Sequence, residues 1–207
     1  ANRVIANIGG ISNITVLPSD GSCFGFDTGP GNLLLDAWCS KNTGNSFDDK
    51  GSWGATGQVH GALLKQLMSH PFISQTAPKS TGREMFNLVW LEQQLNGYSL
   101  AAQDIQATLV SFTAQSLAGA INGLNQPAHE VYICGGGAFN DQLMAQLQIE
   151  LGPVTLHSTQ RLGLDPTWVE ACAFGWLARQ RMTNQPGNLP RVTGASRETV
   201  LGALYLP

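Results

Sequence analysis

Short runs of β-branched and other apolar residues open the chain and predict three antiparallel strands. The glycines between the first two runs are typical of a β-hairpin, and a polar turn precedes the third run. We expect Asp27 to end the third strand. The runs cover residues 3–8, 12–17 and 23–27, and the turns between them cover 9–11 and 19–22.

Helical periodicity dominates the middle of the chain, where apolar residues recur every three or four positions. A polar, glycine-containing stretch at 41–53 interrupts it and is predicted to be a surface loop. Residues from about 54 to 123 are interpreted as a helical insertion within one domain, 1–207. The predicted helices of this part of the chain cover residues 31–40, 55–69, 87–96 and 104–122.

The last third of the chain alternates strand and helix. Strands are predicted at 130–134 and 154–157, with a helix beginning near Asn140 between them. Asp165 followed by Pro166 predicts the start of the final long helix, because an aspartate cap before proline is a common start signal. This order predicts an α/β fold of the ribonuclease-H-like kind: a mixed sheet, three antiparallel strands first, flanked by helices.

Composition excludes several classes of function. Only 12% of the residues are charged and the net charge is -3, so we expect no nucleic-acid partner. The apolar runs are shorter than the roughly 20 residues that a membrane-spanning helix needs, so we expect no membrane partner. The four cysteines and four histidines show no metal-ligand spacing, which predicts no metal site and a reduced, cytoplasmic protein.

The hairpin turn Gly9-Gly10 is the first candidate for chemistry, with Asn7 and Asn13 on either side of it. Two adjacent glycines allow backbone N–H groups to approach an anion closely, which suits a phosphate. The alternative is an ordinary Gly-Gly hairpin turn without a ligand.

A second candidate is the acidic, glycine-rich stretch from Asp27 through Thr28 and Gly29 to Asn32. An aspartate held at a strand end can act as a general base or hold Mg through water. The alternative is that Asp27 or Thr28 only caps a turn.

In a third segment, Thr81 and Glu84 have the spacing of a capping box before the next helix. The capping box does not explain Lys79 and Arg83. These two residues are interpreted either as ligands of a substrate phosphate or as ordinary solvated charges.

Gly135, Gly136 and Gly137 follow a buried strand and form the fourth candidate. Glycines without Cβ atoms would allow a flat group such as adenine to lie against the backbone, although a plain strand-to-helix turn explains them equally well. Asn140 stands where a dinucleotide fingerprint needs its third glycine, which argues against an NAD site.

Glu170 is the fifth candidate, because it interrupts an otherwise apolar helix that begins with Trp168. A carboxylate in such surroundings needs solvent, a partner or a ligand. A sugar is one possible ligand, and a favourable interaction with the helix dipole is the alternative.

Taken together, five motifs resemble the anhydro-N-acetylmuramic acid kinases, members of the actin, sugar kinase and heat-shock chaperone superfamily. The motifs occur in the family's order: NIGGISNIT, GFDTGPGNLLLDAW, APKSTGREMFN, CGGGAFN and GNLPRVTGAS. The resemblance implies an ATP- and Mg-dependent enzyme of peptidoglycan recycling. Such an enzyme opens the anhydro ring with water and phosphorylates O6 of the sugar.

The resemblance also implies a role for each matching residue. Asp27 matches the family's catalytic base. The implied sugar-binding residues are Glu170, Thr28, Gly29 and Asn32, and the implied ATP and phosphate ligands are Asn7, Gly9, Gly10, Asn13, Gly135, Gly136, Gly137 and Asn140.

The family's amino-terminal lobe, with its own phosphate loop, has no counterpart in this sequence. We therefore expect the chain to need that lobe as a partner, together with the sugar and ATP, and to be inactive alone; a homodimer is also expected. The alternatives are a non-catalytic nucleotide-sensing module and a dimerisation module. A sensor would need the glycine loops but no base beside a sugar.

Overall fold

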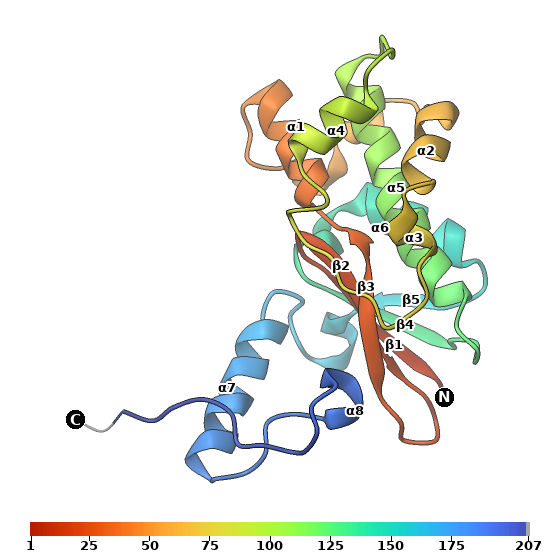
Figure 1. Cartoon of the computed structure of the whole chain (residues 1–207). Helices are drawn as coiled ribbons and strands as arrows, with labels where there is room; N and C mark the ends of the chain where they lie inside the picture. Colours follow the sequence, from red (N-terminus) through yellow and green to blue (C-terminus); the bar gives the residue numbers. More distant parts are fainter. Residues whose placement is uncertain (206–207) are drawn as a thin grey trace.

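The computed structural model describes residues 1–205 and is built around a five-stranded mixed sheet (Figure 1). The strand order is β3-β2-β1-β4-β5. The three amino-terminal strands pair antiparallel, whereas β4 pairs parallel with β1 and β5 pairs parallel with β4. This is the predicted ribonuclease-H-like arrangement. The strands are β1 (Arg3–Ile8), β2 (Ile11–Leu17), β3 (Phe24–Pro30), β4 (Glu130–Cys134) and β5 (Thr155–Ser158).

Alternation along the first two strands gives the sheet one buried face and one more open face. In β1, Val4, Ala6 and Ile8 are buried, whereas Ile5 and Asn7 between them are only partly covered. β2 shows the same alternation. Successive side chains of a strand point to opposite faces, so this pattern fixes which side of the sheet meets the core.

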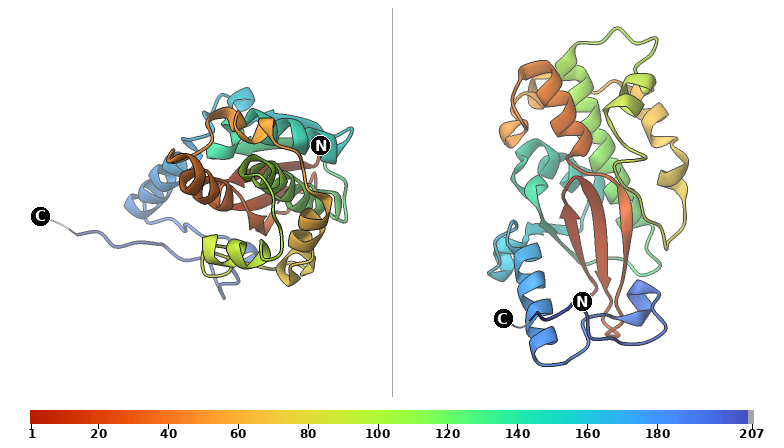
Figure 2. Two further views of the ribbon diagram at one scale, coloured as in Figure 1. Left: turned by 90° about the horizontal axis from the view of Figure 1, so that it is seen from above. Right: turned by 60° about the vertical axis from the view of Figure 1, so that its left-hand side comes forward.

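Helices cover the buried face of the sheet (Figure 2). The longest, α5 (Ala102–Asn122), packs against β2 and β3, and α6 (Asp141–Leu151) packs against α5. Large side chains such as Phe112 are completely buried there. The other helices of this layer are α1 (Leu33–Thr43), α2 (Gly61–Met68), α3 (Pro71–Ser74) and α4 (Leu88–Gln94).

In the middle of the chain, one helix start and one helix cap differ from the sequence prediction. The helix expected over 55–69 is shorter, because α2 begins only after the side chain of His60, whose Nδ1 accepts a hydrogen bond from the Leu63 amide at 3.2 Å. The capping box expected from Thr81 and Glu84 is absent. Instead Asn87 caps α4, and its Oδ1 accepts from the Trp90 amide at 2.9 Å.

The carboxyl-terminal helices α7 (Val169–Met182) and α8 (Pro190–Thr193) lie apart from this helical layer (Figure 1). α7 has no buried residue. Its start was predicted four residues too early, because Asp165 forms a separate turn in which its Oδ1 accepts from the Thr167 amide at 2.8 Å. Large apolar side chains on or beside α7 are between 49% and 72% exposed: Trp168, Phe174, Trp176 and Met182.

Among residues 1–205, no helix is both long and apolar enough to cross a membrane.

Candidate functional site

A row of polar side chains crosses the open face of the sheet. Asn7 on β1 pairs with Asn13 on β2, and Asn13 pairs with Asp27 on β3. Residues paired across neighbouring strands point to the same face, so these three side chains lie side by side. All three are partly exposed. The sequence stretches that contain them are thus brought together by strand pairing.

Asp27 lies within β3 and not at its end, contrary to the sequence prediction. The strand continues to Pro30 because its pairing with β2 resumes after a register shift: Ser12 pairs with Gly29, and Thr28 is the extra residue of a β-bulge. Glycines and proline in this stretch therefore extend the strand, where a turn was expected.

Thr28 and Gly29 were expected to bind the sugar, and the structure places both of them in buried positions. Thr28 is 1% exposed, and its Oγ1 lies 2.7 Å from the Oγ of buried Ser12. Gly29 is also buried, and a Cβ built on it would lie 3.3 Å from Oγ of Ser116 on α5. Both residues pack into the protein, away from the polar row.

Glu170 joins the polar row from α7. The Asn7 side-chain amide donates a hydrogen bond to Glu170 Oε1 at 3.4 Å, across 163 residues of sequence. Cys134 lies beside them at the end of β4. Burial, and secondarily the negative charge of Glu170, raises the pKa of this thiol to about 11.

The Gly9-Gly10 turn is anchored by hydrogen bonds to the residues that lead into α1. Its two carbonyl groups accept hydrogen bonds from the amides that lead into α1: Asn32 N donates to Gly9 O at 2.7 Å, and Gly31 N donates to Gly10 O at 2.9 Å. The Asn32 side chain adds a bond to the Ile8 carbonyl at 3.2 Å. Within residues 1–205 the amides of Gly9 and Gly10 donate no such bond, so they are free for an anion.

The loop after β4 requires glycine at Gly135. Its φ is +80°, and a Cβ there would lie 2.4 Å from Asn7 Oδ1 and 2.7 Å from the Ile8 carbonyl oxygen. Its amide donates to the Pro166 carbonyl at 2.9 Å. A Cβ on Gly137 would meet Ile8 in the same way, at 2.3 Å. This loop therefore packs directly against β1, beside the Gly9-Gly10 turn.

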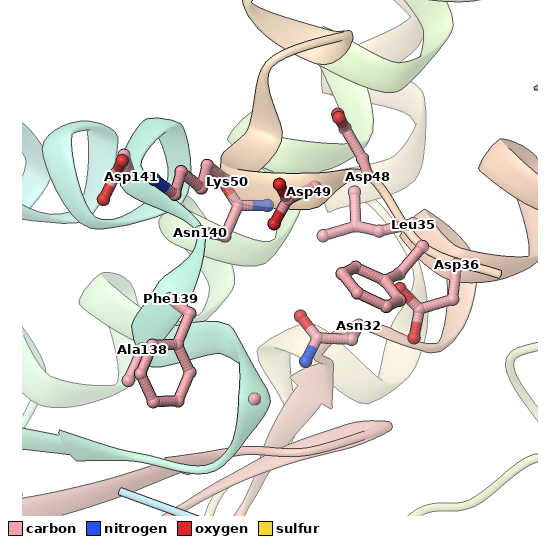
Figure 3. Close-up of a pocket in the computed structure, with 12 residues that line it drawn as sticks. Asn32, Leu35, Asp36, Asp48, Asp49, Lys50, Ala138, Phe139, Asn140 and Asp141 are labelled. Carbon is pink, nitrogen blue, oxygen red and sulfur yellow. The ribbon is translucent and has the colours of Figure 1, made fainter. Parts of the chain in front are cut away.

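A pocket of about 730 Å³ opens next to these glycines (Figure 3). That volume is in the range of small-molecule sites. Three residues predicted to bind ligand line it, namely Asn32, Gly136 and Asn140. Further lining residues come from α1, from the 47–50 segment, from the loop after β4 and from the start of α6: Leu35, Asp36, Phe47, Asp48, Asp49, Lys50, Ala138, Phe139 and Asp141.

Two of these lining residues are already partly explained by the fold. Asn140 caps α6, because its Oδ1 accepts from the Leu143 amide at 3.0 Å. Asp48 accepts from the amides of Trp53 and Gly54, each at 2.8 Å, and so folds the 47–57 segment around the pocket. The stretch predicted to be a plain surface loop is therefore one wall of the pocket.

Sequence reasoning missed Asp36 as a pocket residue. Burial raises its pKa from the usual value near 3.8 to about 6. The available signal was the same as for Glu170, since Asp36 is the one carboxylate in the apolar stretch Leu33–Trp38. Sequence distance hid the pocket itself, because its walls come from segments about a hundred residues apart.

The segment around Ser80 contacts Asp27 directly. Asp27 Oδ2 accepts two hydrogen bonds, from Ser80 Oγ and from the Thr81 amide, each at 2.9 Å. Lys79 is partly exposed, and its ammonium donates to the carbonyls of Phe72 at 3.0 Å and Ile73 at 3.1 Å. Burial lowers the pKa of Lys79.

No group of three or more histidine, cysteine, aspartate or glutamate side chains that could hold a metal ion occurs in the described part of the chain.

The comparisons with known proteins cover essentially the whole chain. A family model described as anhydro-N-acetylmuramic acid kinase matches residues 1–207. The chain is 52% identical over 205 residues to the anhydro-N-acetylmuramic acid kinase of Shewanella loihica, covering 98% of this chain and 55% of that protein. It is 48% identical over 206 residues to that of Coxiella burnetii, covering 99% of this chain and 55% of that protein.

Among solved structures, the activator of 2-hydroxyisocaproyl-CoA dehydratase from Clostridium difficile is similar, with a TM-score of 0.48 and 18% identity. The match covers 80% of this chain and 55% of that one. The chain spans about 55% of the length of the curated kinases that it matches. With a family model that matches every residue from 1 to 207, the chain belongs to the anhydro-N-acetylmuramic acid kinase family.

Proposed function

We propose that this chain supplies the base, the sugar-binding carboxylate and the adenosine pocket of a kinase that acts on 1,6-anhydro-N-acetylmuramic acid in peptidoglycan recycling. The observation that carries the proposal is the polar row, with a carboxylate at each end. Asp27 lies on β3, and Glu170 contacts Asn7 on β1. Two strand spacings of about 4.8 Å separate β1 from β3, so Asn7 and Asp27 lie about 10 Å apart, and Glu170 lies beyond Asn7. The sugar is proposed to lie over this row, between the two carboxylates.

The phosphates of ATP are proposed to bind at the Gly9-Gly10 turn, where the two amides donate no hydrogen bond within residues 1–205 and the two carbonyls accept from the amides that lead into α1. The adenosine is proposed to occupy the pocket lined by Gly136, Asn32 and Asn140. This pocket adjoins the turn, because Asn32 bonds to Gly9 and Ile8 and also lines the pocket. Sugar and nucleotide would therefore meet at the end of β1.

Mg is proposed to enter with ATP. Such an ion would be bound mainly by phosphate oxygens and water. When bound, the ion would neutralise charge on the phosphates. Asp27 is the carboxylate of the polar row on the β3 side and could orient water toward the ion or the sugar.

In the proposed reaction, Asp27 takes a proton from a water molecule whose oxygen attacks C1 of the anhydro sugar. The C1–O6 bond breaks, and its electron pair goes to O6. O6 then attacks the γ-phosphorus of ATP, and the bond to the leaving ADP oxygen breaks. The products are N-acetylmuramic acid 6-phosphate and ADP. Most of the catalysis comes from positioning and charge stabilisation.

The remaining length of the related proteins is proposed to form an amino-terminal lobe that covers α7. Support comes from the apolar side chains beside and along this helix, such as Trp168 and Phe174, which are 63% and 72% exposed. Exposed apolar surface of this kind marks an interaction site. Closure of such a lobe over the polar row would exclude water other than the attacking molecule.

The test is an ADP-release assay on a full-length protein that contains this chain, with the anhydro sugar and a panel of other sugars. We expect turnover only with the anhydro sugar, and loss of at least a hundredfold in kcat in Asp27→Asn. Asp20→Asn is the matched control, because Asp20 lies in an exposed turn outside the polar row and accepts from the Ser22 amide at 2.8 Å. Near-normal turnover by Asp27→Asn would refute the proposed mechanism.

The same assay tests the role of Glu170. We expect Glu170→Ala to raise KM for the sugar much more than KM for ATP, because its contact is with Asn7 in the polar row and not with the adenosine pocket. An effect on KM for ATP alone would place Glu170 elsewhere.

A further inference from the structure

The carboxylate of Asp27 is held asymmetrically. Its Oδ2 accepts two hydrogen bonds, from Ser80 Oγ and from the Thr81 amide. Its Oδ1 accepts none within residues 1–205. Two donors on one oxygen fix the plane of the carboxyl group and leave the lone pairs of the other oxygen unshared. A freely rotating aspartate on an exposed strand face would have no such preference.

The segment that provides these donors is itself anchored. The Asp27 amide donates to the Lys79 carbonyl at 3.2 Å, so the segment runs alongside β3. The Lys79 side chain extends the other way and bonds to two carbonyls at α3. Its ammonium also lies 4.6 Å from the centroid of the buried Phe72 ring, a cation–π contact.

From this geometry we infer that Ser80 is a positioning residue, which orients Asp27 so that Oδ1 faces the attacking water. The inference rests on the proposed function, in which Asp27 is the base. Ser80 touches neither substrate in this scheme and acts only through the Asp27 carboxylate. The Thr81 amide provides the second bond and cannot be removed by a side-chain change, so Ser80 is the position at which the orientation can be tested.

The experiment compares Ser80→Ala with the unchanged protein in the full-length kinase. We expect kcat to fall about tenfold, the loss typical of one hydrogen bond to a charged group. KM values for the sugar and for ATP should stay within about twofold, because the bond orients a base and binds no substrate. Ser80 is exposed in a loop, so the melting temperature should not change.

Two comparisons separate positioning from a structural effect. Ser80→Thr keeps a hydroxyl and should recover most of kcat, whereas Ser74→Ala should have no effect. Ser74 is a matched control, because it is also exposed and its Oγ donates only to the Pro71 carbonyl at 3.2 Å. Equal losses in Ser80→Ala and Ser80→Thr, or in Ser74→Ala, would overturn the inference.

A double variant tests whether Ser80 acts through Asp27. If it does, Ser80→Ala should cause no further loss when added to Asp27→Asn, because the group that it orients no longer acts as a base. Additive losses would overturn the inference. Full activity of Asp27→Asn would refute the proposed function instead, and full activity of Ser80→Ala beside an inactive Asp27→Asn would refute only the positioning role.

Discussion

Replacement of Gly135 by alanine should destabilise the chain strongly, for a reason local to the junction between β4 and β1. The backbone at Gly135 has φ +80° and ψ 176°, a region that side chains other than glycine avoid. Holding alanine there costs about 1–3 kcal/mol. The new Cβ would also lie 2.4 Å from Asn7 Oδ1 and 2.7 Å from the Ile8 carbonyl oxygen.

Relief of this overlap requires movement of a backbone carbonyl in the central strand of the sheet. Overpacking of this kind costs about 1–3 kcal/mol. The two contributions give about 2–6 kcal/mol in total, with a midpoint of about 4 kcal/mol. For a chain of this size, 1 kcal/mol changes the melting temperature by about 2–4 °C, so the midpoint predicts that Gly135→Ala melts about 8–16 °C lower.

Thermal unfolding followed by circular dichroism, at a fixed scan rate, measures this difference. Gly136→Ala is the matched control from the same loop. Its Cβ would meet only Asn32 Nδ2, at 3.4 Å, and its φ is not in the left-handed region. We expect it to melt within about 2 °C of the unchanged chain. The reasoning is refuted if Gly135→Ala melts as close to the unchanged chain as Gly136→Ala does.

Two further predictions concern titration and reactivity. Burial raises the pKa of Asp36 to about 6 from its usual 3.8, so the folded chain binds more protons than the unfolded chain between about pH 4 and 6. The free energy of unfolding should therefore fall as pH rises through that window. Asp36→Asn should melt at a higher temperature than the unchanged chain above pH 7 but not near pH 4. A difference in melting temperature that does not depend on pH would contradict this. In thiol titration, exposed Cys172 should react first and Cys172→Ser should remove that phase, whereas buried Cys134, with its pKa raised to about 11, should react only on unfolding. Rapid labelling of Cys134 in the folded chain would show that its surroundings are open.

The sheet and its main helices were predictable because their signals are local. Runs of β-branched residues mark β1 and β2, and β4 was predicted at the residues where it occurs. The bounds of α5 were predicted to within two residues, because its apolar positions repeat over many turns. The starts of α2 and α7 were predicted too early. Helical periodicity alone does not show that His60 caps α2 or that Asp165 forms a separate turn before α7.

The site was only partly predictable, because its members depend on register and on distant segments. Asn7 and Asn13 were selected from one motif and Asp27 from another, and only the pairing of β1, β2 and β3 shows that all three share a face. The burial of Thr28 could not be predicted either, because it depends on the bulge in β3. The contact from Ser80 to Asp27 spans 53 residues, so no local pattern could indicate it.

The bulge at Thr28 also restricts how this part of the chain can change. Upstream of it, Asp27 is fixed by its pairing with Asn13 and by its bond to Lys79. Downstream of it, Gly31 and Asn32 are fixed by bonds to the Gly9-Gly10 turn. The few residues between these anchors act as a spacer of set length. Side chains of these spacer residues can be replaced during evolution. An inserted or deleted residue would shift the base relative to the phosphate-binding turn, so related sequences should differ in this segment by substitutions and not by insertions or deletions.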